Sequence, residues 1–213
     1  MSFHKTAPRR SGAAVLMALL AFAPSATLAR APITAEQVQQ AIVFTEDPLE
    51  VEATFSTRQV LRSTRGLIRT PYNDGYLKAA VHRGTGEVRY EMRQTLNYDG
   101  PYRGYRTVNY EAGDLPKTAG LRLVDTTRGH CEAFDSGTAC LETVAFEIPE
   151  AELWRAAETT GGQDPTAWQL KFKPALGRDH RAQIPRAEIL GLLRAVESYR
   201  AARTFSPASV TSR

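Results

Sequence analysis

The clearest structural signal in the chain is the stretch YLKAAVHRGTGEVRYEMR at residues 76–93. Two apolar-rich runs flank a Gly-Thr-Gly turn at residues 84–86, which is the pattern of two antiparallel strands joined as a β-hairpin. In the second run Val88, Tyr90 and Met92 alternate with charged residues, as in a strand with one buried face and one face in water. The stretch therefore predicts an antiparallel sheet in the fold.

Similar patterns recur on both sides of this hairpin. They predict further strands at residues 49–55, 105–111, 121–125, 141–148, 168–172 and 180–184. Short turns separate several of them, including Asp99-Gly100-Pro101, and residues 113–120 are expected to form a loop. Because such short links join neighbouring strands in opposite directions, most of the sheet is expected to be antiparallel.

Three helices are expected around these strands. Thr34 and Gln37 have the spacing of a capping box, which predicts a first helix over about residues 35–44. Pro149 opens a short second helix, and apolar residues at helical spacing predict a longer third helix over residues 185–203.

This order predicts an α+β domain built on a mainly antiparallel sheet of about seven or eight strands. An N-terminal helix, a short helix and a longer C-terminal helix would pack on that sheet. A two-sheet β-sandwich with peripheral helices is the alternative. Residues 30–205 are expected to form one globular domain, and residues 206–213 a disordered tail.

Residues 1–29 have the pattern of a cleavable signal peptide. Three basic residues precede an apolar run over residues 12–22, and small residues end the segment at Ala29. The run is too short to cross a bilayer, so the protein is not expected to be transmembrane. Cleavage near Ala29 would release it into the periplasm or the extracellular space without a lipid anchor, since no cysteine lies near the cut. The Arg9-Arg10 pair leaves twin-arginine export open, but the general secretion route is favoured.

The net charge changes when this segment is removed. The whole chain has 27 Lys and Arg against 23 Asp and Glu, and residues 1–29 contain three of the basic residues and no acidic one. The mature chain therefore carries 24 minus 23, or +1, which argues against nucleic acid as a partner. A separate cluster of arginines either meets an anionic surface or balances the acidic residues 46–52; it consists of Arg58, Arg62, Arg65 and Arg69.

Cys131 and Cys140 are expected to form a disulfide, because exported thiols tend to pair. A closed loop of about ten residues would stabilise the fold by roughly 2.5 to 3 kcal/mol in the chain-entropy estimate. The Cys-x-x-Cys spacing of redox catalysts is missing, so a structural bridge is the favoured interpretation.

The sequence favours neither a metal centre nor a nucleophilic enzyme. Acidic residues and one histidine surround the two cysteines, but the histidines do not have the spacings of metal sites. The chain has no Gly-x-Ser-x-Gly motif, and its one Ser-x-x-Lys spacing, from Ser2 to Lys5, lies within the expected signal peptide. No cofactor is therefore expected, and the balance is against an enzyme without excluding one.

A group of tyrosines and arginines around the Gly100-Pro101 turn is the candidate binding site. Its members are Tyr98, Tyr102, Arg103, Tyr105, Arg106 and Tyr110. Exposed rings would stack on sugar faces while the arginines bind carboxylate or hydroxyl groups of an envelope glycan or protein. The alternative is that the rings close the core and only their hydroxyls reach water, which is the more common role of tyrosines on strands.

These features predict an exported, non-catalytic binding or accessory module of the bacterial cell envelope. One alternative is an envelope hydrolase acting on glycan or peptide, with acid-base groups drawn from Glu91, Glu111, Asp114 and Glu142. The other alternative is a structural subunit that pairs with another chain through an exposed strand edge.

Overall fold

The computed structural model describes residues 33–58, 75–113, 115–124, 131–134, 137–159 and 165–205. These residues all belong to one compact unit, Pro32–Arg213. The expected signal peptide, the expected tail and three of the four clustered arginines lie outside the described residues.

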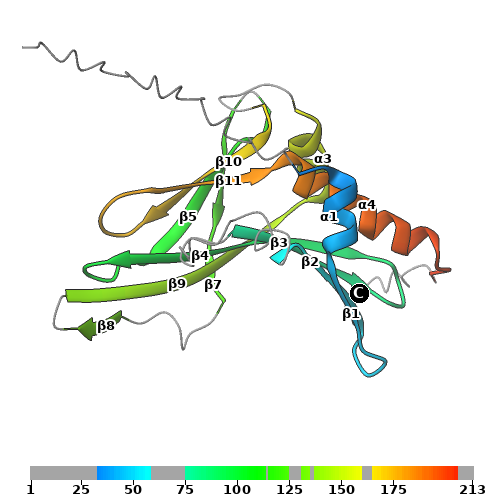
Figure 1. Cartoon of the computed structure of the whole chain (residues 1–213), viewed down its shortest axis with the longest axis horizontal. Coiled ribbons are helices and arrows are strands. Elements are labelled where there is room, and N and C mark those ends of the chain that lie inside the picture. Colours follow the sequence, from blue (N-terminus) through cyan, green and yellow to red (C-terminus); the bar gives the residue numbers. More distant parts are fainter. Residues whose placement is uncertain are drawn as a thin grey trace, which may run out of the picture. The chain divides into compact units, whose positions relative to one another are not determined.

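Helices and strands follow one another in the expected order (Figure 1). The helices are α1 (Ala35–Ala41), α3 (Glu150–Glu158) and α4 (Arg186–Ala201). The strands are β1 (Val43–Glu46), β2 (Glu52–Ser56), β3 (Gly75–His82), β4 (Val88–Asp99), β5 (Tyr105–Tyr110), β6 (Lys117–Gly120), β7 (Arg122–Leu123), β8 (Cys131–Phe134), β9 (Gly137–Ile148), β10 (Ala167–Pro174) and β11 (His180–Pro185).

The strands form two antiparallel sheets, which confirms the α+β fold. The larger sheet has seven strands in the order β1-β2-β3-β4-β9-β7, with β8 also paired to β9. The smaller sheet has four strands in the order β11-β10-β5-β6. The expected hairpin is β3 and β4, paired from Val81 opposite Val88 to Gly75 opposite Gln94.

One hydrophobic core joins both sheets to α3 and α4. Its largest fully buried side chains include Trp168, Tyr90 and Phe172. Helix α4 contacts β2, β3 and β11, and α1 packs across α4 (Figure 1). The two helices approach closely at Gly191, where an added Cβ would lie 2.6 Å from the Val38 side chain.

The first helix is shorter than the capping pattern predicts. It ends at Ala41, and Val43 and Phe44 belong to β1 instead. The Phe44 ring lies 4.9 Å from the ring of Phe55 and 5.6 Å from that of Tyr199. These contacts with distant residues stabilise the extended conformation, and the local sequence gives no sign of them.

The strand predicted at residues 49–55 begins only at Glu52. Leu49 and Val51 lie in the β1–β2 turn with exposed fractions of 93% and 66%. The apolar alternation therefore marks a buried strand face only at Ala53 and Phe55.

The expected loop at residues 113–120 contains strand β6, and only Arg122–Leu123 of the strand predicted at 121–125 is β7. Strand β6 pairs with β5, from Lys117 opposite Tyr110 to Gly120 opposite Thr107. Its polar sequence carries no apolar alternation, so pairing with a neighbouring strand decides its conformation.

The outer face of the central hairpin was expected to lie in water, which is wrong at Glu91. This residue is only 5% exposed, and its carboxylate accepts hydrogen bonds from Arg93 and Arg122. The attraction of two guanidinium groups offsets the desolvation cost of one buried carboxylate.

Candidate functional site

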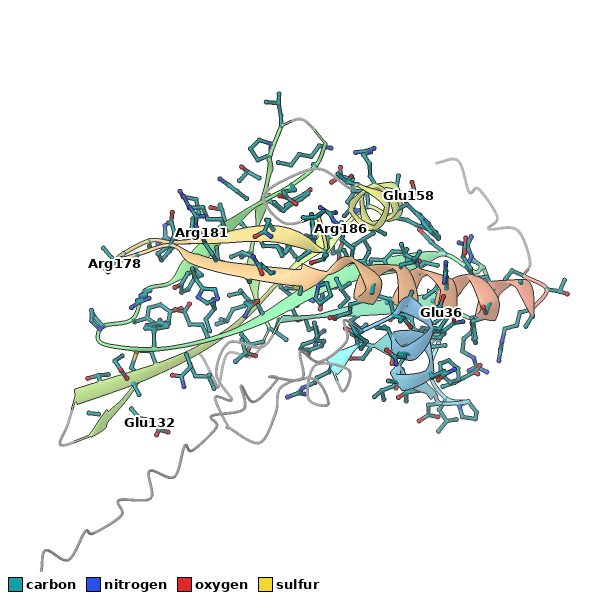
Figure 2. The ribbon with its side chains drawn as sticks, turned by 45° about the horizontal axis from the view of Figure 1, so that its top comes forward. Glu36, Glu132, Glu158, Arg178, Arg181 and Arg186 are labelled. Carbon is teal, nitrogen blue, oxygen red and sulfur yellow. A yellow bond between two sulfur atoms is a disulfide. The ribbon has the colours of Figure 1, made fainter. Side chains whose placement is uncertain are left out.

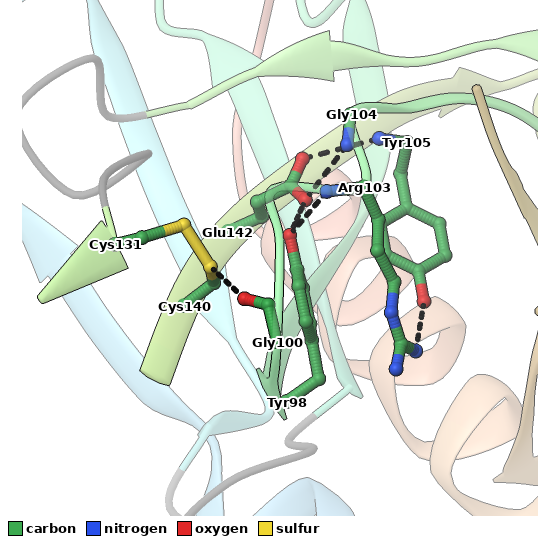
Figure 3. Close-up of a disulfide and its surroundings, with 8 residues drawn as sticks. All are labelled: Tyr98, Gly100, Arg103, Gly104, Tyr105, Cys131, Cys140 and Glu142. Carbon is green, nitrogen blue, oxygen red and sulfur yellow. Dashed lines mark hydrogen bonds between the residues drawn. A yellow bond between two sulfur atoms is a disulfide. The ribbon is translucent and has the colours of Figure 1, made fainter. Parts of the chain in front are cut away.

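The candidate site lies where β4 ends and the chain turns into β5. Tyr98 stands near the end of β4, opposite Cys140 of β9, and Tyr105 begins β5. Glu142 of β9 lies below the connecting loop, and Figure 3 shows its carboxylate directed toward that loop. Residues from the two sheets therefore meet at this point.

Glu142 anchors the loop through its carboxylate. Its side chain is buried, with 1% of the residue exposed. Oε1 accepts hydrogen bonds from the Tyr98 hydroxyl and from the Gly104 amide at 3.1 Å, and Oε2 accepts one from the Tyr105 amide at 3.1 Å. Three donors on one buried carboxylate fix the path of the chain from β4 to β5.

Arg103 links this loop to a second one. Its guanidinium carbon lies 4.4 Å from the centre of the Tyr98 ring, and its Nη1 donates to the Tyr105 hydroxyl at 3.4 Å. Its carbonyl oxygen accepts hydrogen bonds from the amides of Ala175 at 3.0 Å and Leu176 at 3.1 Å. The turn between β10 and β11 is thereby held beside the β4–β5 loop.

The disulfide lies next to the same loop. Cys131 and Cys140 stand opposite each other on β8 and β9, with their sulfur atoms 1.92 Å apart. The Gly100 amide donates to Thr138 at 2.8 Å, and the Gly100 carbonyl oxygen lies 3.2 Å from the Cys140 sulfur (Figure 3). The disulfide therefore supports the strands that carry Glu142, as expected for a structural bridge.

Four exposed residues in or next to the two loops form what we call the loop face: Tyr102, Arg106, Leu176 and Arg178. Tyr102 is 45% exposed and Leu176 is 65% exposed. The two loops lie close together at Gly104, where an added Cβ would be 3.2 Å from the Tyr102 ring and 3.9 Å from the Ala175 side chain. Figure 2 shows Arg178 at the tip of the β10–β11 hairpin, at the end away from α4. The loop face thus combines an aromatic ring and an aliphatic side chain with two guanidinium groups.

The titratable groups around the loop face leave it positively charged. Partial burial, followed by the effect of Glu142, raises the pKa of the Tyr98 and Tyr102 hydroxyls, so both remain protonated at neutral pH. Burial, and then the charge of Arg103, lowers the pKa of His180 at the start of β11. His180 is therefore neutral at pH 7, and the arginines carry the charge.

The structure brings together most of the tyrosines and arginines that the sequence singled out. Tyr98, Tyr102, Arg103 and Tyr105 surround Glu142, although Tyr105 is only 6% exposed. Arg106 is exposed and interacts electrostatically with Tyr102.

Tyr110 lies apart from this group, in the core. Its ring stacks on Phe146 at 5.5 Å and meets Trp168 edge-on at 5.5 Å, while its hydroxyl donates to Glu152 at 2.8 Å. Its ring therefore packs in the core, as in the alternative interpretation of the tyrosines.

Sequence patterns missed two residues of the loop face, Leu176 and Arg178. Both lie in the turn near Gly177. The only signal in the sequence is a leucine next to a glycine and two charged residues. Glu142 is a candidate acid-base group from the sequence alone. No local pattern indicates its contact with the loop, because Gly104 and Glu142 are 38 residues apart in the chain.

Glu91 and Glu142, two of the carboxylates considered for hydrolysis, do not form a pair. Glu91 binds two arginines, and Glu111 accepts from the Gln169 amide at 3.2 Å and from Arg186 at 3.4 Å. Glu91 stands opposite Glu147, five positions along β9 from Glu142, which is about 17 Å of strand. Glycosidases need their two carboxyl groups roughly 5 to 9.5 Å apart. Asp114 lies outside the described residues.

Two pockets occur elsewhere on the described part of the chain. One, of about 550 Å³, lies near the start of β4 and is lined by residues that include Glu52, His82 and Glu147. The other, of about 240 Å³, lies on the smaller sheet beside Asn109 and Lys171. The loop face lines neither of these two pockets.

Among the described residues, no group of three or more His, Cys, Asp or Glu side chains is placed to hold a metal ion. Within the same ranges no helix combines the length and the apolar character needed to cross a membrane.

No protein-family model, curated protein or solved structure matches the chain. The chemistry of the loop face is therefore the starting point for its function.

Proposed function

We propose that this protein is an exported, non-catalytic binding module of the bacterial cell envelope, and that it binds a carboxylate-bearing glycan through the loop face. The observation that carries the proposal is the anchoring of both loops by Glu142 and Arg103. Because these contacts already order the loops, little conformational entropy is lost when a ligand binds.

The chemistry of the loop face supports an anionic sugar ligand. The Tyr102 ring and the Leu176 side chain offer apolar surface against which a sugar ring can pack. Arg106 and Arg178 provide planar guanidinium groups, which bind carboxylates through two parallel hydrogen bonds.

Export is the second part of the proposal. It is supported by the basic and apolar pattern of residues 1–29 and by the pairing of both cysteines, which is typical of oxidising compartments.

The two other hypotheses have less support. Most glycosidases need a pair of free carboxylates, whereas Glu91, Glu111 and Glu142 each bind structural donors. Pairing through a strand edge is not favoured by β1, β6 and β7, which contain only four, four and two residues; β11, at the other edge of the smaller sheet, is longer, with six residues. Short edge strands are one way in which proteins avoid such pairing.

The experiment is a calorimetric titration of the exported protein with soluble peptidoglycan fragments. We expect fragments with free carboxylates to bind and the same fragments with amidated carboxylates to bind about tenfold more weakly, a difference of about 1.4 kcal/mol. Tyr102→Ala, Leu176→Ala and Arg106→Ala should each weaken binding by a similar factor, because each removes one main contact.

Matched controls come from exposed residues elsewhere. Leu115→Ala, at a leucine that is 76% exposed, is the control for Leu176→Ala, and Arg155→Ala is the control for Arg106→Ala. Absence of binding, or equal losses in the control variants, would contradict the proposal. Cleavage of the fragments would favour the hydrolase instead.

A further inference from the structure

A second exposed surface lies at the turn between β1 and β2, residues 47–51, which we call the hairpin tip. Figure 1 shows this turn at the end of the hairpin that β1 and β2 form. Leu49 is 93% exposed and Val51 is 66% exposed. Two large apolar side chains next to each other in water are costly unless a partner covers them.

The hairpin tip is held in one conformation by Arg83. Its Nη1 donates to the carbonyl oxygens of Asp47 at 3.0 Å, Pro48 at 3.2 Å and Glu50 at 2.8 Å. The Arg83 amide also donates to the Val51 carbonyl at 2.9 Å. One guanidinium group thus gathers three carbonyls of the turn, so the apolar side chains are presented on an ordered backbone.

Arg83 is linked through Glu46 to the end of α4. Its Nε lies 3.1 Å from Glu46, whose other carboxylate oxygen pairs with Arg203 at 2.8 Å. Glu46 also accepts from the Tyr199 hydroxyl at 3.3 Å. The hairpin tip is therefore fixed to the end of the longest described helix.

The negative charge of the hairpin tip indicates which kind of partner can bind there. Asp47 precedes the two apolar residues and Glu50 lies between them, while the guanidinium of Arg83 is directed at backbone carbonyls and Glu46. An anionic membrane surface repels such a tip. A protein pocket with an apolar floor and Lys or Arg at its rim has the complementary chemistry.

We propose that the hairpin tip docks a second envelope protein by inserting Leu49 and Val51 into an apolar pocket with a basic rim. This surface is distinct from the loop face. The two lie near opposite ends of β4, whose 12 residues span about 40 Å. The protein is thereby able to hold a glycan at one end and a protein partner at the other.

The test places a photoreactive benzoyl-phenylalanine at position 49 of the full chain, expressed in its native cells. We expect illumination to yield an adduct with one other protein, and fragmentation to place the link beside apolar and basic residues of that protein. The same group at position 115, another exposed leucine, is the matched control and should give no such adduct.

Three further variants of this labelled chain test the chemistry. Val51→Asp should reduce the adduct by about tenfold or more, as should the double change Asp47→Lys and Glu50→Lys. Arg83→Lys leaves every residue of the hairpin tip unchanged, but one ammonium group cannot gather three carbonyls. It should also reduce the adduct, with the circular dichroism spectrum and melting temperature confirming that the chain remains folded.

Several results would overturn the docking proposal. These are no adduct at position 49, an adduct with lipid or with a second copy of the chain, or an adduct that survives the charge reversal. Binding of the purified protein to phosphatidylcholine or phosphatidylglycerol vesicles would do the same. Glycan titration distinguishes the two proposals, because the variants of the hairpin tip should leave it unchanged.

Discussion

At the scale of single residues, burial decides what a carboxylate does. Glu91 and Glu142 are acidic residues on neighbouring strands, and either is a reasonable acid-base group from sequence alone. The structure buries both and surrounds them with donors, two guanidinium groups for Glu91 and two amides with a hydroxyl for Glu142. Their main role is therefore to hold neighbouring groups in place.

Replacing Glu142 should loosen the β4–β5 loop. Glu142→Ala leaves two amides and one hydroxyl without their acceptor, so we expect a loss of about 2 to 4 kcal/mol in the free energy of unfolding. Glu142→Gln retains one acceptor oxygen and should cost less. Urea unfolding measures both, with Glu87→Ala as the exposed control; a loss no larger than that of the control would contradict this role.

Tyr110 should make the fold sensitive to alkaline pH. Burial, followed by its hydrogen bond to Glu152, raises the pKa of Tyr110 to about 12. The folded protein therefore holds this proton more tightly than the unfolded chain, whose tyrosine pKa is about 10. The stabilisation is complete below pH 10 and is lost as the pH rises from about 10 to about 12.

The measurement is the melting temperature between pH 9 and pH 12. We expect Tyr110→Phe to be less stable than the natural protein at pH 9, because it lacks the bond to Glu152, but to lose less stability as the pH rises. Parallel curves of melting temperature against pH for the two proteins would show that Tyr110 does not contribute to the loss of stability at alkaline pH.

At the scale of elements, local patterns succeed where a strand or helix is long and rich in apolar residues. Hairpin β3–β4 and helix α4 are of this kind, and both were predictable. Strands β1 and β6 have four residues each and depend on pairing with β2 and β5. A short segment contains too few positions for its period to be recognised.

The contact between α1 and α4 should depend on the absence of a side chain at Gly191. In Gly191→Ala the new Cβ would lie 2.6 Å from Val38 and 2.8 Å from the Ala35 carbonyl oxygen. We expect a net loss of about 1 to 2 kcal/mol, since the clash exceeds the gain in helix propensity of about 1 kcal/mol. Thermal unfolding measures it, with Glu197→Ala as the exposed control on the same helix. A more stable variant would mean that α1 is free to shift.

Breaking the disulfide should destabilise the β8–β9 hairpin without unfolding the domain. For the double variant Cys131→Ser and Cys140→Ser, chain entropy predicts a loss of about 2.5 kcal/mol. The core that joins both sheets does not include this hairpin's end, so the folded state should persist. Calorimetry of this variant, and of the natural protein with and without reductant, checks the prediction. An unchanged melting temperature on reduction would contradict it.

At the scale of the whole molecule, the two candidate surfaces differ in chemistry. The loop face is aromatic and basic, whereas the hairpin tip is aliphatic and acidic. Strand β4 joins the two ends through continuous pairing with β3 and β9. An accessory module that connects two partners needs this kind of separation, since each partner must bind without excluding the other.

Export has a direct consequence for the mass of the protein. We expect the protein isolated from the envelope to begin at Arg30 and to carry a net charge of +1, because the proposed export removes residues 1–29. Intact-mass spectrometry without reductant should also show two hydrogens fewer than the reduced mature chain. A protein that retains Met1 and remains in the cytosol would remove the basis for the envelope function.

The sequence by itself determined the class of fold, the order of the main elements and the pairing of the two cysteines. These features depend on period, turn residues and the count of cysteines, all of which act within short stretches of chain or follow from composition. The tertiary structure alone decided the division of the strands into two sheets, the burial of Glu91 and Glu142, and the places of the loop face and the hairpin tip. Each of these depends on contacts between residues far apart in the chain, where packing and desolvation outweigh local preference.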